Sequence, residues 1–318
     1  MTLWLIGAGP MAQDYAKVLK SLCLDFEVIG RNAASAKAFE LKTGRRVQQG
    51  GLSSVLFSTT APEQAIVAVG VEQLARVATE LIRAGTRRIL LEKPGALNAK
   101  ELLALCQTAA EHKAAVMIAY NRRFYASTTL ARELIAADGG ATSCIFEFTE
   151  WPETITPIDF APGVKEAWFL VNSSHVVDLA FHLCGLPKDW QAWHGGSLNW
   201  HPSAARFCGS GITEQGTYFS YHADWEAPGR WGVEVLTRSR RFIFRPMEQL
   251  QVILLGSTRM DNVDLDDRLD KEFKPGLYQQ TKAFLRRDDH LFCTVDEQYR
   301  HYAIYNKMAG YDRAVSVG

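Results

Sequence analysis

Short apolar runs alternate with amphipathic stretches along the first 121 residues of the chain. Apolar runs of roughly four to eight residues are typical of buried strands, and apolar residues recurring every three to four positions are typical of helices. The pattern predicts strands at residues 2–6, 26–30, 54–59, 64–70, 87–94 and 114–121, and helices at 10–19, 71–85 and 101–113. Buried strands alternating with helices indicate an α/β fold with a doubly wound parallel sheet.

A different pattern begins at residue 122. It predicts a helix at 127–140, a strand at 144–151, a buried helix at 172–185, four strands at 216–225, 229–238, 240–247 and 248–256, and a last helix at 298–310. Consecutive strands separated by turn residues are typical of an antiparallel sheet. Because 318 residues suit two domains of about 150 residues each, we predict domains at 1–121 and 122–318.

Charge and cysteine content exclude several classes of protein. The chain has 35 basic and 35 acidic residues and no long run of like charge, which argues against nucleic acid or a membrane surface as partner. Six cysteines without a Cys-x-x-Cys pair favour a reduced, intracellular protein. The first residues resemble a strand rather than a secretory leader, so we expect a cytoplasmic location.

A glycine-rich turn joins the first predicted strand to the first predicted helix. The turn carries Gly7-x-Gly9-x-x-Ala12, with Pro10 and Met11 between the second glycine and the alanine. The first glycine permits a tight turn, the second lets a diphosphate approach the backbone, and the small third residue lets helix and strand pack closely. These five residues therefore predict a dinucleotide-binding site in the domain at 1–121.

The end of the second predicted strand indicates which dinucleotide is bound. An acidic residue there usually binds the ribose hydroxyls of NAD, but this chain has Gly30 followed by Arg31 and Asn32. A guanidinium pairs with the 2′-phosphate of NADP, whereas an acid repels it. We predict NADP as the cofactor, with NAD as the alternative.

The buried helix at 172–185 carries three ionisable residues. His175, Asp178 and His182 occupy positions i, i+3 and i+7, so they share one face among apolar neighbours. Buried imidazole and carboxylate groups are costly unless they are paired or used. The helix alone leaves two interpretations open, which are a satisfied internal network and a functional site.

Four motifs occur in a fixed order along the chain. Gly7-x-Gly9-x-x-Ala12, Glu92-Lys93-Pro94, Asn121-Arg122-Arg123-Phe124 and Asp178-x-x-x-His182 together resemble the Gfo/Idh/MocA oxidoreductase family, which includes glucose-fructose oxidoreductase and inositol dehydrogenase. The resemblance implies an N-terminal Rossmann domain and a C-terminal α+β domain with a large, mostly antiparallel open sheet. It also implies a homo-oligomer, a dimer or a tetramer, formed through that sheet.

The resemblance also implies roles for individual residues. Lys93 is expected near the nicotinamide, Pro94 often follows a cis bond in the family, and Glu92 and Asn121 are expected at the cofactor. His182 is expected to exchange the substrate proton while Asp178 holds substrate hydroxyls, and histidine titrates near the neutral pH that this exchange needs. The expected substrate-binding residues are Lys93, Arg122, Arg123, Trp151, Trp168, His175, Asp178 and His182.

These features predict an NAD(P)-dependent oxidoreductase acting on a hydroxyl or keto carbon of a sugar or sugar derivative. Nucleotide-linked and acidic sugars of polysaccharide synthesis are the expected substrates, by analogy with the family. One alternative is a non-catalytic nucleotide or sugar sensor, or a partner-binding protein, with the same fold. A lesser alternative is a metal-dependent enzyme using His175, Asp178 and His182, although hydride transfer to nicotinamide needs no metal.

Overall fold

The computed structural model describes residues 3–311, which fold into two compact units. The first unit comprises Met1–Asn121 and Lys271–His301, and the second comprises Arg122–Asp270 and the chain from Tyr302. The first division falls after Asn121, as the sequence pattern indicated. The segment Lys271–His301, which that pattern assigned to the second domain, packs with the first unit instead.

The first unit is built on a seven-stranded sheet with the order β15-β6-β5-β4-β1-β2-β3. Strands β1 to β6 are parallel to their neighbours, and β15 is antiparallel to β6. The predicted doubly wound parallel sheet is therefore confirmed. The strands are β1 (Leu3–Ile6), β2 (Phe26–Ile29), β3 (Val47–Gln48), β4 (Gln64–Val67), β5 (Arg88–Leu91), β6 (Ala115–Ile118) and β15 (Cys293–Thr294).

The helices predicted at 10–19, 71–85 and 101–113 are present in the first unit, and three further helices that the structure describes in this unit were not predicted. In α4, for example, the buried residues Leu74, Val77, Ala78, Leu81 and Ile82 recur at helical spacing. The helices are α1 (Pro10–Ser21), α2 (Ala33–Thr43), α3 (Leu52–Leu56), α4 (Leu74–Arg83) after the short turn η1 (Val71–Gln73), α5 (Ala99–Glu111) and α10 (Leu277–Arg286). Helix α11 (Val295–Ala309) begins in this unit and continues past its end at His301.

The strand predicted at 54–59 is wrong. Residues 52–56 form α3, in which Leu52 and Val55 are buried three positions apart while Ser53 and Ser54 are exposed. Gly50 and Gly51 precede it with φ values of +101° and +81°, which turn the chain out of the preceding strand. The strand that pairs with the outer side of β2 is instead β3, at Val47–Gln48.

The second unit contains an eight-stranded sheet with the order β14-β13-β12-β11-β7-β10-β9-β8. Strands β7 and β10 are parallel and all other neighbours are antiparallel, so the predicted, mostly antiparallel sheet is confirmed. The strands are β7 (Ser143–Glu147), β8 (Pro187–Gly195), β9 (Arg206–Thr213), β10 (Tyr218–Asp224), β11 (Gly232–Leu236), β12 (Arg240–Phe244), β13 (Gln251–Leu254) and β14 (Asp261–Asn262).

Two long strands of this sheet, β8 and β9, were not predicted. No residue of β8 is fully buried, and both its half-buried and its exposed positions mix apolar with polar residues, so the sequence lacks the apolar alternation that marks a strand. In β9, Gly209 and Gly211 interrupt the apolar pattern, because Tyr221 and Trp190 pack where their side chains would lie. The sequence therefore shows a turn-rich region where the structure has a hairpin.

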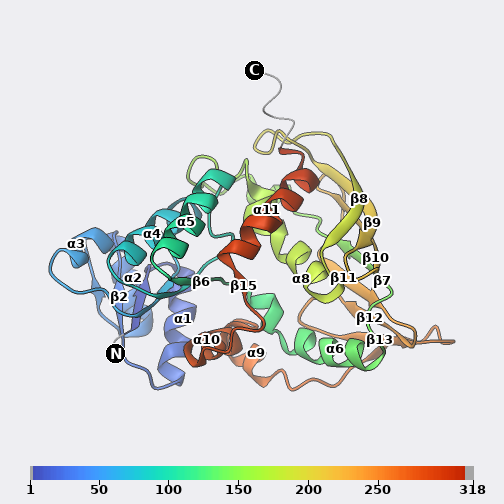
Figure 1. Ribbon diagram of the computed structural model, residues 1–318, viewed down its shortest axis with the longest axis horizontal. Coiled ribbons are helices and arrows are strands. Elements are labelled where there is room, and N and C mark those ends of the chain that lie inside the picture. Colours follow the sequence, from blue (N-terminus) through green and yellow to red (C-terminus); the bar gives the residue numbers. More distant parts are fainter. Residues whose placement is uncertain (1–2, 312–318) are drawn as a thin grey trace. The chain divides into compact units, whose positions relative to one another are not determined.

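Helix α8 (Ser174–Cys184) lies against β7 and β11 of this sheet (Figure 1). Phe181 of α8 makes edge-to-face contacts with Phe146 and Phe219 of the sheet. Ten of the eleven residues of α8 are buried, which confirms a helix buried nearly all round, and His182 alone is half-buried. The other helical segments here are α6 (Ala126–Ala137), α7 (Pro152–Ile155), the π-helical turn η3 (Phe169–Ser173) and α9 (Arg268–Glu272).

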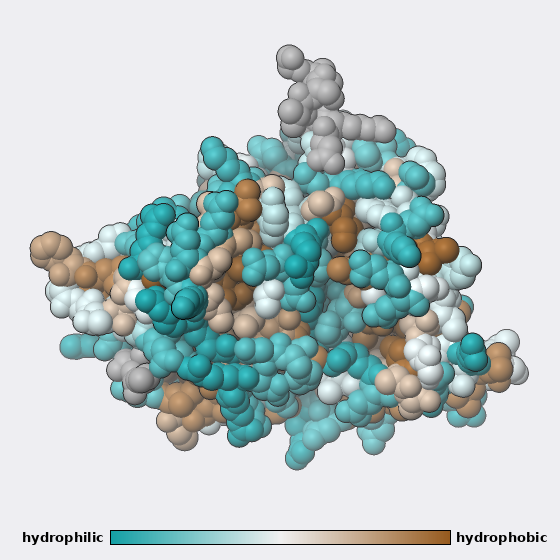
Figure 2. All heavy atoms as spheres, viewed as in Figure 1, coloured by the Kyte–Doolittle hydropathy of each residue, from teal (hydrophilic) through white to brown (hydrophobic). Residues whose placement is uncertain are grey.

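Hydrophilic side chains cover much of the face seen in Figure 2, and hydrophobic residues gather at the end that carries α3. Phe57, directly after α3, is 96% exposed. Within residues 3–311, no helix combines the length and the apolar content needed to cross a bilayer.

Candidate functional site

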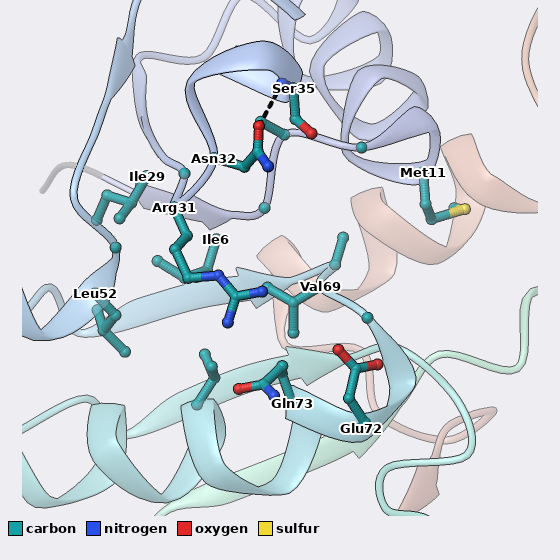
Figure 3. Close-up of a pocket in the computed structure, with 18 of the residues that line it drawn as sticks. Ile6, Met11, Ile29, Arg31, Asn32, Ser35, Leu52, Val69, Glu72 and Gln73 are labelled. Carbon is teal, nitrogen blue, oxygen red and sulfur yellow. Dashed lines mark hydrogen bonds between the residues drawn. The ribbon is translucent and has the colours of Figure 1, made fainter. Parts of the chain in front are cut away.

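A cavity of about 400 Å³ opens at the carboxyl ends of β1, β2 and β4 (Figure 3). Strand β1 lies between β2 and β4, where the order of the sheet reverses. Ligands of doubly wound sheets bind in the crevice outside such a reversal. The residues that line it include Gly7, Gly9, Pro10, Met11, Arg31, Asn32, Ser35, Glu72, Gln73 and Arg76.

The glycine turn fits a diphosphate for two separate reasons. Gly7 has a φ of +124°, and a Cβ there would lie 2.2 Å from the carbonyl oxygen of Ala68. Gly9 has a φ of −81°, and a Cβ there would meet no atom within 4 Å. Glycine is therefore not needed here to relieve backbone strain, but it leaves space for a ligand. The turn leads into α1, where Ala12 is fully buried, as the close packing of helix and strand requires.

The start of α1 offers unpaired backbone donors to the cavity. Gly9 is the N-cap and no side chain caps the helix, while Pro10 has no N–H to satisfy. The first helical backbone bond runs from Gln13 N to Gly9 O, so the amides of Met11 and Ala12 precede the ladder. Such a helix start attracts an anionic group through its free N–H groups and its dipole.

Alanine substitutions at the two glycines are expected to separate folding from binding. Gly7→Ala should lower the free energy of unfolding by about 1–3 kcal/mol or more, because alanine is strained at this φ and clashes with Ala68. Gly9→Ala should unfold like the parent but bind dinucleotide about tenfold or more weakly, since its methyl group enters the diphosphate space. Denaturant titration and calorimetry measure the two effects. Normal dinucleotide binding by Gly9→Ala would refute the assignment of this turn.

The second helix of the unit does not offer the same site. Asn32 caps α2, because its side-chain oxygen accepts hydrogen bonds from the amides of Ala34 at 2.8 Å and Ser35 at 3.2 Å. Arg31, beside it, is exposed and points into the cavity (Figure 3). Arg31 forms no salt bridge within the described part of the chain, whereas Arg76 bonds to Gln73 and Glu80. Arg31 thus has a charge available for a bound phosphate.

The segment Glu92-Lys93-Pro94 follows directly after β5. The Lys93–Pro94 bond is cis, as the family resemblance implies, and Gln298 donates a hydrogen bond to the Pro94 carbonyl at 3.0 Å. The hydroxyl of Tyr15 donates to Glu92 at 2.8 Å. Burial raises the pKa of Glu92, while the bond from Tyr15 and the positive charge of Lys93 oppose that rise. The pKa of Tyr15 is raised by burial and by the charge of Glu92.

Asn121, another residue expected at the cofactor, ends the first part of this unit. Its side-chain amide is buried and donates to the carbonyl of Pro275 at 2.9 Å. That bond ties the end of the N-terminal segment to the segment that begins at Lys271 within the same unit.

In the second unit, Asp178 of α8 forms a buried ion pair with Arg123. The Nε and Nη2 atoms of Arg123 donate to its two carboxylate oxygens at 2.8 and 2.5 Å. Both residues were expected to bind substrate, and they bind each other. Because a guanidinium engages both oxygens of Asp178, this geometry weighs against a metal ion held by His175, Asp178 and His182.

Of the remaining residues expected to bind substrate, Trp168 and His175 are buried and Trp151 is exposed. Trp168 is buried and packs edge-on against Phe160 and Trp200, with ring centroids 5.3 and 6.1 Å away. Trp151 is 42% exposed, and its indole donates to the carbonyl of Gly229 at 2.8 Å. His175 is buried with its ring 6.3 Å from that of Trp231, over which Arg122 also lies.

Sequence reasoning missed a buried acid beside the helix. Glu150 is 3% exposed and accepts hydrogen bonds from Ser173 at 2.7 Å and Asn172 at 3.0 Å. Burial raises its pKa, and the hydrogen bonds from Ser173 and Asn172 counter this rise. Asn172 and Ser173, which directly precede α8, thus bind this carboxyl. The position of Glu150 at the end of the strand predicted at 144–151 is the sequence feature that could have identified it.

Three further cavity residues, Glu72, Gln73 and Arg76, were also missed. They lie on η1 and α4, just after β4. Strand β4 was predicted, and ligands bind at the carboxyl ends of such strands. Their position just after the predicted strand could therefore have identified these three residues as ligand-binding candidates.

Comparisons with known proteins agree with this geometry. Residues 1–120 match the model of the Gfo/Idh/MocA family, which is described as an oxidoreductase family with an NAD-binding Rossmann fold. No curated protein sequence matches the chain.

Solved structures resemble almost the whole chain. UDP-N-acetylglucosamine 3-dehydrogenase from Acidithiobacillus ferrooxidans is 19% identical with a TM-score of 0.76, covering 97% of this chain and 96% of that one. Levoglucosan dehydrogenase in complex with NADH and L-sorbose is 16% identical with a TM-score of 0.80, covering 99% and 97%. The WlbA dehydrogenase from Chromobacterium violaceum, in complex with NADH and UDP-GlcNAcA, is 16% identical with a TM-score of 0.72, covering 98% and 94%.

At these identities the solved structures establish the fold, and the family match covers the glycine turn, Arg31 and Lys93. Residues 1–120 are therefore similar to the NAD-binding Rossmann domain of the Gfo/Idh/MocA oxidoreductase family, and nearly the whole chain shares the fold of these solved dehydrogenases.

Proposed function

We propose that the protein is an NADP-preferring dehydrogenase of a sugar or sugar derivative, with NAD as the alternative cofactor. The first unit, with the cavity at Gly7, Gly9 and Arg31, binds the dinucleotide, and the second unit binds the substrate. The observation that carries the proposal is the cavity itself, which combines an uncapped helix start with an arginine that has no carboxylate partner among residues 3–311.

Three residues act on the substrate in this proposal. When bound, the oxidised nicotinamide accepts the hydride from the alcohol carbon. His182 takes the hydroxyl proton in oxidation and returns it in reduction, and Lys93 donates a hydrogen bond that stabilises the developing alkoxide. Asp178, fixed by Arg123, holds a further substrate hydroxyl.

The preference for NADP depends on Arg31. We expect Arg31→Asp to lower the ratio of kcat/KM for NADP to that for NAD by about tenfold or more, since the guanidinium pairs with the 2′-phosphate and the carboxylate repels it. Arg83→Asp is the matched control, because Arg83 is an exposed arginine at the end of α4 that does not line the cavity. An unchanged ratio in Arg31→Asp would contradict the choice of NADP.

Nucleotide-linked sugars are the substrates that the similar structures support. One of them is named for UDP-N-acetylglucosamine and another was solved with UDP-GlcNAcA, although a third is named for levoglucosan.

We also propose a cytoplasmic homo-oligomer, a dimer or tetramer formed through the eight-stranded sheet. Light scattering of the purified protein tests the assembly, and a monomer would contradict it.

The proposed activity is tested by incubating the purified protein with NADP⁺ or NAD⁺ and a panel of neutral, acidic and nucleotide-linked sugars. Formation of reduced nicotinamide with one class of sugar is the expected result. Tight binding of the dinucleotide, with no sugar reducing its oxidised form and no keto sugar oxidising its reduced form, is the contrary result. That result would favour the non-catalytic sensor.

A further inference from the structure

Two arginines of the second unit lie over one indole ring. The guanidinium carbon of Arg122 is 4.8 Å from the centroid of Trp231, and that of Arg230 is 4.9 Å from the same ring. Arg230 also lies 4.3 Å from the ring of Trp151. Each contact is a favourable cation–π interaction, but together they bring two like charges to one side chain.

Neither positive charge is neutralised by an ion pair within the described part of the chain. The salt bridges of this unit involve other arginines, including Arg123 with Asp178 and Arg245 with Glu147. The nearby carboxyl of Glu150 is engaged by Ser173 and Asn172. Burial lowers the pKa of Arg122, and the charge of Arg230 adds to this decrease. The negative charges of Tyr125, Glu248 and Glu150 oppose the decrease.

Two buried donors at this place also have no hydrogen-bond partner among the described residues. They are the Nε of Arg122 and the indole N–H of Trp231, which is 8% exposed. A buried N–H without an acceptor costs about 1–3 kcal/mol. Two donors without acceptors among the described residues, beside two arginines that form no salt bridge there, favour a bound acceptor that carries negative charge.

The backbone that carries Arg230 and Trp231 is held in place. The amide of Arg230 donates to Glu147 at 3.1 Å, and the indole of Trp151 donates to the Gly229 carbonyl. A Cβ on Gly229 would lie 2.5 Å from the same carboxylate of Glu147, so the close approach requires glycine there. The side chains of Arg230 and Trp231 thus extend from a fixed backbone rather than from a free loop.

The cluster adjoins the helix expected to bind substrate. His175 of α8 lies with its ring 6.3 Å from that of Trp231, and it precedes Asp178 by three residues on the same face of α8. Arg122 is followed directly by Arg123, the partner of Asp178. An anion bound at the cluster therefore lies beside α8.

We propose that Arg122, Arg230 and Trp231 bind an anionic group of the substrate, a carboxylate or a phosphate. Guanidinium groups form charge-assisted, paired hydrogen bonds with both kinds of oxyanion. The indole packs against the guanidinium groups and shields them from water. This inference rests on the proposed sugar dehydrogenase and narrows its substrates to acidic or phosphate-bearing sugars. Arg230 and Trp231 then determine specificity for the class of substrate.

The test measures binding without turnover, on protein saturated with NADP⁺ so that Arg31 is occupied. Glucuronate and glucose 1-phosphate are titrated by calorimetry and compared with glucose, which lacks the anion. At least one anionic probe should bind about tenfold or more tightly than glucose, and whichever does so identifies carboxylate or phosphate as the recognised group. Arg230→Gln should abolish the preference, and Arg122→Gln should reduce it.

Arg238→Gln is the matched control, because Arg238 is an exposed arginine of the same unit with no salt bridge in the described region. It should keep the preference for the anion. Equal affinity for glucose and both anionic probes, or no binding of any, overturns the proposal, as does a preference that survives in both arginine variants. Loss of NADP⁺ binding or of hydride transfer would instead overturn the proposed function, which is measured separately.

Discussion

His182→Asn is expected to lower kcat by about two to four orders of magnitude while leaving dinucleotide affinity unchanged. Asparagine has nearly the shape of histidine but cannot exchange a proton near neutral pH, and a positioned acid or base contributes about 10²–10⁴-fold to the rate. His182 is also the one residue of α8 that is not buried, so its replacement leaves the packing of the helix on β7 and β11 intact. Steady-state rates of nicotinamide reduction and dinucleotide titration measure the two quantities.

His222→Asn serves as the control for this experiment. His222 is an exposed histidine on β10 of the same unit, and its replacement should leave kcat within about twofold of the parent, as surface substitutions usually do. A His182→Asn protein with the parent kcat would show that another group exchanges the substrate proton. An equal loss in both variants would point to a general loss of structure.

Breaking the pair between Arg123 and Asp178 is expected to have the largest effect on stability. Arg123→Met or Asp178→Leu alone should lower the free energy of unfolding by about 3–5 kcal/mol, because each leaves one buried charge without its counter-ion. The double variant should be destabilised by much less than the sum, since it removes both charges. Urea denaturation of the four proteins gives the coupling energy directly.

This cycle also separates two roles of Asp178. If the carboxylate serves the fold alone, the double variant should regain both stability and activity. If it also holds substrate, as we propose, the double variant should regain stability while KM stays raised. Additive losses of stability in the two single variants would contradict the ion pair as the structure describes it.

Local patterns along the chain predicted much of the fold. The glycine turn at Gly7 and Gly9, the parallel strands and the buried helix of Asp178 all follow from apolar periodicity and turn residues, which act over a few positions. The same holds for Arg31, because the end of β2 can be located from the strand pattern alone. Local rules failed at α3, where the apolar run Val55-Leu56-Phe57 resembles a short strand although Leu52 and Val55 lie on one face of a helix.

Contacts between distant residues could not be predicted in this way. Arg123 and Asp178 are 55 positions apart, so their pairing depends on how α8 packs in the second unit. The return of Lys271–His301 to the first unit likewise depends on tertiary contacts such as Asn121 with Pro275. The two arginines over Trp231 come from segments more than a hundred residues apart, and only the folded chain shows that they share one ring.

The fate of a deuterium label at the reacting carbon tests the central claim most directly. A sugar that the protein oxidises is prepared with deuterium at that carbon, and the nicotinamide product is examined by mass spectrometry. Dehydrogenation by direct hydride transfer predicts that the reduced dinucleotide carries the deuterium, and that label transfer is lost in His182→Asn. Deuterium that appears in water, with none in the dinucleotide, would contradict the account.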